Sequence, residues 1–258
     1  MLNSIQRIRS LLKDDVPYYE EGNILHFIVD ENDRPEWSKA LEHSLATEKT
    51  DLKMSQRYEE FRRIMAGDGK RKRFVDFISA ADGVKVDLSS GPSGYFSPVL
   101  DTLMETDLFI ATDACPAIVR AHSDACRRDN CFVFDIDLDR ELPFHDNSIA
   151  VFSGNLLNNV KHYAELIREI YRCLKPGGRF AVMEMFFENG CRTAEYLSSR
   201  GAVWSSLDTY AAFCESVGLR YIDSDIVQTR TGKIDAGDLL PLDENDRSEE
   251  RAVYFEKV

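Results

Sequence analysis

The sequence predicts an α/β protein built on a doubly wound sheet, and three observations support that prediction. From Gly83 onward, strand-like runs alternate with amphipathic helical runs, as they do when helices cover both faces of a mainly parallel sheet. The 258 residues are enough for one large domain with an additional cap. The first strand-like run ends in a turn rich in serine, glycine and proline, at the place where such sheets bind ligands.

The amino-terminal region, residues 1–80, is predicted to be a mainly helical cap that helps to recognise the substrate. Residues 18–30 are an exception, because Gly22 and Asn23 between apolar runs predict a hairpin. Helical periodicity covers residues 35–80, with a break near residues 67–69. Four aromatic side chains of the cap are candidates to line a pocket, although packing is the commoner fate of each: Tyr18, Tyr19, Trp37 and Tyr58.

The second region, residues 81–258, carries the predicted sheet. The clearest helix begins at Tyr163, where an apolar stripe recurs with helical spacing as far as Leu174. A second clear helix spans residues 207–217 and ends at Gly218. Shorter helices are expected over residues 98–104 and from Pro116, and a long acidic loop between Thr229 and Glu250. Strands are predicted at residues 83–88, 107–113, 131–136, 148–152, 179–187, 219–227 and 251–257.

The composition favours a soluble, cytoplasmic protein. A formal net charge of −13 argues against binding to the phosphate backbone of nucleic acids, and the basic run at residues 70–73 is expected to be a solvated helix face. Apolar runs are too short to span a bilayer, and the amino terminus does not resemble a secretory signal. Six cysteines form no C-x-x-C pair, so we expect reduced thiols and no metal. A small-molecule substrate, with neither nucleic acid nor membrane as partner, is the expectation.

The turn after the first strand is the strongest sign of a binding site. Its sequence, DLSSGPSG at residues 87–94, is rich in small residues that let a backbone approach a ligand closely. The following helix amino terminus would favour anionic groups. A nicotinamide-dependent dehydrogenase would carry G-x-G-x-x-G here, and this chain does not. Taken alone, the turn is equally compatible with an ordinary Gly/Ser loop.

Four segments, in order along the chain, resemble class I S-adenosylmethionine-dependent methyltransferases, with motifs of the type 11 kind. DLSSGP at residues 87–92 resembles D-L-G-C-G-P, and Asp113 ends the second strand where that family carries an acidic residue. Residues 137–148 resemble D-x-x-x-x-L-P-F-x-D-x-S, and residues 169–178 match E-x-x-R-x-L-K-P-G-G. The likeness covers roughly residues 80–258. It implies a Rossmann-like sheet of seven strands, the last of them antiparallel.

The resemblance implies S-adenosylmethionine as cofactor and a role for each matching residue. Asp113 would accept hydrogen bonds from the ribose hydroxyl groups, Asp137 one from the adenine amino group, and the amide of Leu138 would donate to the ring. Asp87 would organise the loop or meet the ammonium group. Simple turn chemistry is the alternative explanation for Asp137 and Asp139. The predicted cofactor-binding residues are Asp87, Ser89, Gly91, Ser93, Gly94, Asp113, Ala114, Asp137, Leu138 and Asn155.

Several positions differ from the family pattern, and they concern activity more than fold. Ser89 and Ser93 replace two glycines, so their hydroxyl groups either bind the ligand or narrow the pocket. Ala150 stands where an aspartate is common, and residues 158–159 are asparagines where a histidine is frequent.

Candidates for catalytic groups are few. His145 and His162 are the nearest possible general bases, and Asn155 could orient an acceptor. A base is needed only if the acceptor starts as a protonated hydroxyl or amine, because displacement at a sulfonium otherwise requires little more than alignment.

The predicted function is methyl transfer to oxygen, nitrogen or carbon of a small organic acceptor. An alternative is an inactive domain that binds S-adenosylmethionine or S-adenosylhomocysteine. Methylation of RNA or protein is disfavoured by the acidic charge.

Overall fold

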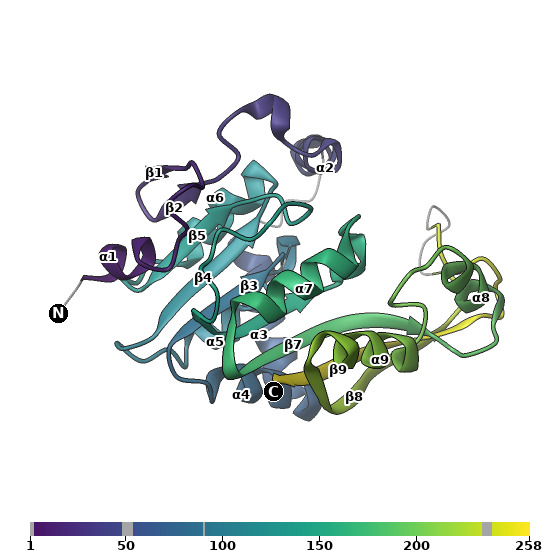
Figure 1. Cartoon of the computed structure of the whole chain (residues 1–258). Coiled ribbons are helices and arrows are strands. Elements are labelled where there is room, and N and C mark those ends of the chain that lie inside the picture. Colours follow the sequence, from purple (N-terminus) through teal and green to yellow (C-terminus); the bar gives the residue numbers. More distant parts are fainter. Residues whose placement is uncertain (1–2, 48–53, 90, 234–238) are drawn as a thin grey trace.

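A nine-stranded sheet crosses the molecule (Figure 1). The structure is a computed structural model that describes residues 3–47, 54–89, 91–233 and 239–258. The strand order is β1-β2-β5-β4-β3-β6-β7-β9-β8. The strands are Tyr19–Glu21 (β1), Ile24–His26 (β2), Val84–Leu88 (β3), Leu108–Asp113 (β4), Cys131–Asp135 (β5), Ile149–Asn155 (β6), Leu174–Phe187 (β7), Leu219–Thr231 (β8) and Arg247–Lys257 (β9).

The predicted α/β fold is confirmed, but the predicted number of seven strands is wrong. Strands β2, β5, β4, β3, β6 and β7 pair in parallel, whereas β9 lies antiparallel between β7 and the edge strand β8, as expected for the last strand. The two additional strands come from the predicted hairpin, which turns at Gly22 with φ +62°. Strand β2 pairs in parallel with β5 and buries Leu25 completely. The hairpin therefore extends the sheet at its edge.

Helices cover both faces of the sheet. Helices α1, α7 and α9 pack with one apolar cluster, and α3, α4, α5 and α6 with another. In Figure 1, α7 and α9 lie in front of the strands. The helices are Ser4–Arg9 (α1), Glu36–Thr47 (α2), Met54–Gly67 (α3), Gly69–Ser79 (α4), Ser97–Leu100 (α5), Pro116–Ala125 (α6), Tyr163–Cys173 (α7), Arg192–Ser199 (α8) and Leu207–Val217 (α9), with 3-10 turns at Glu31–Asp33, Gly91–Ser93 and Leu157–Asn159.

A separate, mainly helical cap over residues 1–80 is not confirmed. Helices α3 and α4 serve as covering helices of the sheet, and the hairpin belongs to the sheet itself. The predicted break at residues 67–69 is present, because Asp68 caps α4 by accepting hydrogen bonds from the amides of Lys70 and Arg71. Helix α2 contributes Trp37 and Leu41 to the wall of a cavity at the carboxyl ends of the strands.

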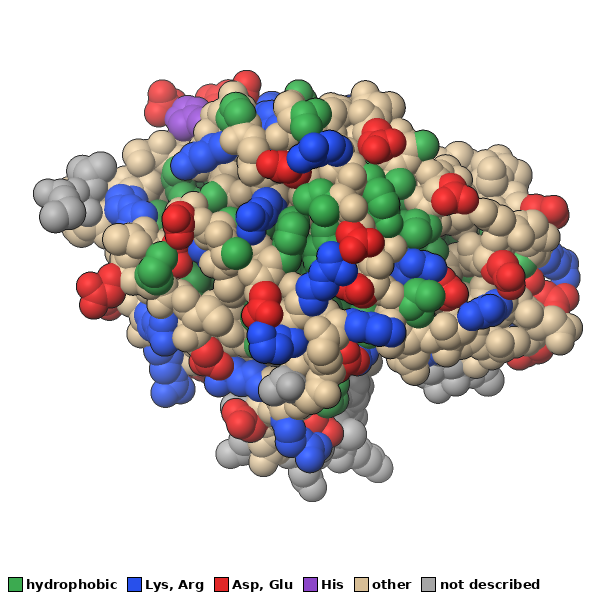
Figure 2. Space-filling model, turned by 90° about the horizontal axis from the view of Figure 1, so that it is seen from below, with side chains coloured by type: hydrophobic (Ala, Val, Ile, Leu, Met, Phe, Trp, Pro, Cys, Tyr) green, Lys and Arg blue, Asp and Glu red, His purple; other side chains and the backbone are tan. Residues whose placement is uncertain are grey.

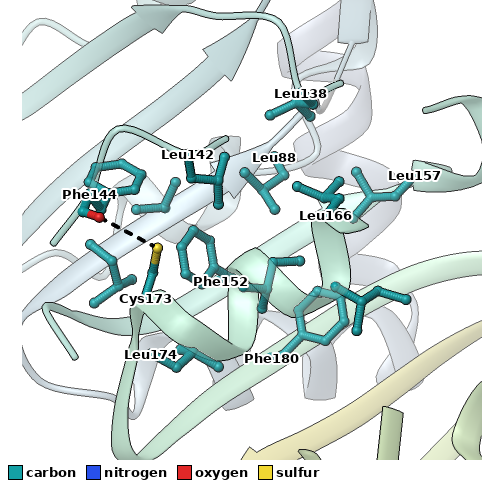
Figure 3. Close-up of a cluster of buried hydrophobic side chains, with 14 of the residues drawn as sticks. Leu88, Leu138, Leu142, Phe144, Phe152, Leu157, Leu166, Cys173, Leu174 and Phe180 are labelled. Atoms are coloured by element: carbon teal, nitrogen blue, oxygen red, sulfur yellow. Dashed lines mark hydrogen bonds between the residues drawn. The ribbon is translucent and has the colours of Figure 1, made fainter. Parts of the chain in front are cut away.

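The buried stripe of α7 packs against the centre of the sheet. Leu166 lies near Phe152 and Phe180 in the cluster of Figure 3, and the thiol of Cys173 contacts the carbonyl oxygen of Phe144 at 3.9 Å. The helix ends at Cys173, so Leu174, predicted as its last apolar residue, begins β7 instead. Five of the six cysteines are buried and all are free.

The E-x-x-R pair of the sequence motif braces the loop before β6. Glu169 accepts a hydrogen bond from the amide of Leu142 at 3.0 Å, and Arg172 donates to the carbonyl oxygens of Leu142 and Phe144. Arg172 also pairs with Asp146 at 2.7 Å. The two motifs therefore form one unit, in which α7 holds the L-P-F segment in place.

Several predicted boundaries are wrong where pairing extends beyond the local pattern. Strand β6 continues to Asn155, and α5 ends at Leu100. Strands β8 and β9 pair from Leu219 with Lys257 to Thr231 with Arg247, so the two ends of the predicted acidic loop are strand. Polar side chains on the exposed positions of this hairpin hide the alternation that would have identified it. Helix α8 was not predicted.

The basic run at residues 70–73 lies on α4 and is paired with carboxylates. Arg73 contacts Asp223 at 2.7 Å and Asp225 at 3.0 Å on β8, and Lys72 contacts Asp76 at 2.6 Å. Figure 2 shows acidic and basic side chains interspersed around a central group of apolar ones on the face seen from below. Within the described residues, no helix has the length and apolar character needed to cross a membrane.

Candidate functional site

A cavity of about 550 Å³ opens at the carboxyl ends of β3, β4 and β5, within the size range of small-molecule sites. Its walls come from strand ends, from α2 and from the loop after β6. Seven of the ten predicted cofactor residues line it. The lining residues are Trp37, Leu41, Ser89, Gly91, Pro92, Asp113, Ala114, Ile118, Ile136, Asp137, Leu138, Asp139, Asn155, Leu156, Asn159 and Val160.

Asp113, the last residue of β4, carries a buried carboxyl group with one oxygen unused. Its Oδ1 accepts a hydrogen bond from the amide of Cys115 at 2.8 Å, whereas Oδ2 is buried without a partner among the described residues. Burial raises the pKa of Asp113 to about 7, although amide hydrogen bonds from Cys115 and Ala114 oppose the shift. A buried polar atom without a partner is costly, so this oxygen suits a ligand that donates a hydrogen bond.

The second carboxyl group at the cavity, Asp137, is partly engaged in turn chemistry. Its Oδ1 accepts a hydrogen bond from the amide of Asp139 at 3.0 Å, and Oδ2 lies 3.7 Å from Arg140. Burial raises its pKa. The turn explanation and a ligand role are therefore compatible, since an oxygen of Asp137 keeps acceptor capacity. Leu138 lines the cavity beside it.

The Gly/Ser turn after β3 approaches the cavity through left-handed backbone. Ser89, Gly91 and Gly94 have φ of +53°, +58° and +58°. Ser89 and Gly91 line the cavity, whereas Gly94 does not. Asp87 also lies off the cavity wall and accepts a hydrogen bond from the hydroxyl of Ser153 at 2.7 Å. This contact fits the predicted role of Asp87 in organising the loop.

Two predicted positions fall where side chains are not described. The backbone of Ser93 belongs to the 3-10 turn, but its side chain lies outside the described part, as does that of Tyr58. Tyr18 and Tyr19 pack elsewhere, Tyr18 against Phe27 and Tyr19 on His26.

The end of β6 and the loop that follows it supply a further part of the cavity wall. Asn155 is the last residue of β6, and its Oδ1 is buried without a partner within the described residues. Leu156 follows in a left-handed conformation, with φ +50° and ψ +49°. Asn159 and Val160 complete this wall.

Helix α2 is attached to the cavity by a buried arginine that the sequence did not reveal. Arg34 is 5% exposed and donates to both carboxylate oxygens of Asp135, at 2.8 and 3.0 Å, and to the carbonyl oxygen of Ala114 at 2.5 Å. The hydroxyl of Ser38 donates to the same carbonyl oxygen. Trp37 and Leu41 therefore lie against the cavity from a helix whose amino end is fixed beside Asp113.

The predicted catalytic histidines do not line the cavity. His145 is exposed, and its amide donates to the carbonyl oxygen of Leu11. His162 is half-exposed, and its Nδ1 lies 3.4 Å from Oδ1 of Asp139, which does line the cavity. Ala150 is buried in β6, off the cavity wall, so the missing aspartate does not alter this wall.

The polar groups that line the cavity suit a nucleoside-type ligand. Two acceptor oxygens, on Asp113 and Asn155, are buried at the cavity without a partner among the described residues, and apolar side chains also line it. Three aspartates line the cavity, and no lysine, arginine or histidine does so within the described residues. Such a lining favours a neutral or cationic ligand over an anionic one.

Residues 86–182 match the model of a methyltransferase domain family. This segment, 97 of the 258 residues, is similar to a methyltransferase domain. The matched segment runs from β3 into β7 and includes the Gly/Ser turn, Asp113, Asp137 and Asn155. The predicted resemblance to methyltransferases, and with it the prediction of an enzyme, is confirmed.

Proteins of similar sequence are also methyltransferases. A demethylmenaquinone methyltransferase of Listeria welshimeri is 51% identical over 45 residues, and the ubiquinone/menaquinone biosynthesis C-methyltransferase UbiE of Brucella canis is 47% identical over 45 residues. Each match covers 17% of this chain and 19% or 17% of the relative, so the chain spans less than a fifth of the length of these curated relatives.

Two solved methyltransferases have the same fold. Geranyl diphosphate C-methyltransferase of Streptomyces coelicolor, in complex with S-adenosyl-L-homocysteine, gives a TM-score of 0.59 at 12% identity and covers 87% of this chain and 99% of its own. A SAM-dependent methyltransferase of Aquifex aeolicus gives 0.53 at 14% identity, with 81% and 100% covered. At these identities the likeness concerns the fold.

Proposed function

We propose that the protein transfers a methyl group from S-adenosylmethionine to a small organic acceptor. The observation that carries the proposal is the unpartnered Oδ2 of Asp113, buried at the cavity beside a methyltransferase Gly/Ser turn. The ribose of S-adenosylmethionine would supply the missing hydrogen-bond donors. When bound, this molecule provides an activated methyl group on a sulfonium.

The chain's own residues bind and orient. Asp113 accepts from the ribose hydroxyl groups, Asp137 and the amide of Leu138 contact the adenine, and Ile118 and Ile136 provide apolar surface. Ser89 and Gly91 let the backbone approach the amino-acid portion. The three aspartates favour a cationic sulfonium electrostatically.

The acceptor is a neutral, mainly apolar molecule in this proposal. The wall away from the strand ends consists of Trp37, Leu41, Leu156, Asn159 and Val160, and the described lining offers no cation to pair with a carboxylate or phosphate. Trp37 supplies a flat indole surface. Because the names of the curated relatives indicate quinone methylation, neutral aromatic rings are the first acceptor class to test.

Helix α2 would then recognise the acceptor through Trp37 and Leu41, and Arg34 and Ser38 would hold the helix in place. If the acceptor carries a proton, His162 beside Asp139 is the nearest candidate base.

Calorimetry with S-adenosylhomocysteine tests the site directly. Wild-type protein is expected to bind, and Asp113→Ala to lose about 1.5–3 kcal/mol of binding free energy, because a charge-assisted hydrogen bond is removed. His145→Ala, remote from the cavity wall, is the matched control and keeps wild-type affinity. Unchanged affinity of Asp113→Ala would remove this carboxyl group from the site.

A binding protein without transfer activity is the second candidate. It is favoured by the strained serine at position 89 and by the absence of a histidine from the described cavity lining. Turnover of S-adenosylmethionine with a panel of neutral aromatic, amine and carboxylate acceptors separates the two. Tight binding of the product with no turnover on any acceptor would favour this second candidate.

A further inference from the structure

Glu184 is a fully buried carboxyl group on β7 that the proposed site does not include. It follows Met183, which pairs with Asn155 across β6 and β7. Oε2 of Glu184 accepts a hydrogen bond from the amide of Asn158 at 3.0 Å, and Oε1 accepts one from the amide of Met185 at 2.9 Å. The first of these bonds joins β7 to the loop that forms a wall of the cavity.

That loop has a backbone that needs external support. Leu156 is left-handed, a conformation disfavoured for a branched side chain. Its amide donates to the carbonyl oxygen of Met183 at 2.8 Å. Leu157 is fully buried against Gly154, where a Cβ atom would lie 2.7 Å from Cδ1 of Leu157. The loop is thus fixed at its start by β7 and Gly154, and at Asn158 by Glu184.

We propose that Glu184 is a positioning residue: by accepting the Asn158 amide, it holds residues 155–160 in the conformation that presents Asn155, Leu156 and Asn159 to the cavity. Glu184 does not line the cavity, so we expect it to act through the loop. The part of this proposal that concerns ligand affinity rests on the proposed function, whereas the part that concerns the loop does not.

The surroundings of Glu184 suggest how to test it. Its neighbours are the hydroxyl groups of Tyr163 and Tyr210, which lie 2.7 Å apart, with Cys214 behind Tyr210. Burial raises the pKa of Glu184 to about 8, against hydrogen bonds from the amides of Met185 and Asn158 and from Tyr163. The carboxyl group is therefore mainly protonated at neutral pH, and glutamine is its closest neutral analogue.

The experiment compares full-length wild type with Glu184→Ala, Glu184→Gln and Tyr210→Phe by hydrogen–deuterium exchange and by calorimetry with S-adenosylhomocysteine. We expect Glu184→Ala to speed exchange at residues 156–160 at least about tenfold while β3 and β4 exchange as in wild type. Its affinity should fall roughly fivefold to tenfold. Glu184→Gln should restore most of both, since its carbonyl oxygen can accept the Asn158 amide, although its NH2 group cannot accept the Met185 amide as Oε1 does. Tyr210→Phe disturbs the same buried polar cluster without touching that bond and should leave the loop unchanged.

Three results would overturn the proposal. Wild-type exchange at residues 156–160 in Glu184→Ala would mean that the bond does not hold the loop. Faster exchange throughout the sheet would make Glu184 a residue of the fold alone, and Glu184→Gln behaving like Glu184→Ala would exclude the accepted hydrogen bond as the cause. If wild type itself binds no S-adenosylhomocysteine, the proposed function fails and the exchange data alone decide the role of Glu184.

Discussion

The two walls of the cavity are built on different principles. The first wall consists of the ends of β3, β4 and β5, where Ser89, Asp113 and Asp137 follow directly from paired strands. The second wall consists of α2 and the loop after β6, which depend on remote side chains, Arg34 and Glu184. The sheet ladder thus fixes the first wall, whereas the second wall also depends on single buried polar groups.

This difference separates what the fold determines from what this chain adds. The first wall and the loop after β6 lie within the segment that matches the methyltransferase family, and α2 lies outside it. A scaffold that fixes the cofactor side and leaves the other side to an attached helix can change its acceptor without disturbing the sheet. The predictions below test whether the walls are as independent as this comparison implies.

The largest effect is expected at Arg34. Arg34→Ala leaves the carboxylate of Asp135, 2% exposed, without its guanidinium partner. Removing one partner of a buried pair costs on the order of 3 kcal/mol of unfolding free energy. Denaturant unfolding measures this loss, and calorimetry on the folded fraction should show S-adenosylhomocysteine affinity reduced far less than acceptor turnover.

Arg73→Ala is the matched control for that change. Arg73 also pairs with two aspartates, but its side chain is 46% exposed, so its removal should cost less than about 1 kcal/mol. Equal losses for the two arginines would contradict the importance of the buried attachment. Loss of cofactor affinity as large as the loss of turnover in Arg34→Ala would show that the two walls are not independent.

The second prediction concerns the pH dependence of the first wall. The pKa of Asp113 is raised to about 7 by burial, and ligand hydroxyl groups donate to its ionised form. Binding must therefore release a proton below this pKa. S-adenosylhomocysteine affinity should fall by up to about tenfold per pH unit as the pH drops below 7, and level off above it. Calorimetry between about pH 5.5 and 8 measures the profile.

Asp113→Asn provides the control, because its amide does not titrate. Its affinity should be weaker than that of wild type at high pH and flat across the same range. A slope that persists in Asp113→Asn would assign the titration to another group, such as Asp137, whose pKa burial also raises.

The sequence allowed the first wall to be predicted far better than the second. The strand ends can be predicted from local periodicity, and the order of the motifs along the chain predicts that Asp113 and Asp137 lie at them. Arg34 and Asp135 are separated by 101 positions and Glu184 and Asn158 by 26, and no periodic pattern relates either pair. The hairpin was predicted from Gly22 and Asn23, but its pairing with β5 depends on an edge that exists only in the folded sheet.

The smallest expected effect tests the unusual serine of the first wall. Ser89 has φ +53°, and its amide donates to Thr112 through the backbone, so glycine can replace it without loss of that contact. Ser89→Gly removes the cost of a left-handed backbone at a residue with a side chain, but glycine also increases the conformational entropy of the unfolded chain. The free energy of unfolding should therefore rise by only about 0.5 kcal/mol. Ser89→Ala keeps the strain and removes the hydroxyl group. If that hydroxyl group binds the ligand, both variants lose affinity for S-adenosylhomocysteine equally. If the side chain merely narrows the cavity, Ser89→Gly binds at least as well as wild type, and calorimetry on the two variants decides between these outcomes.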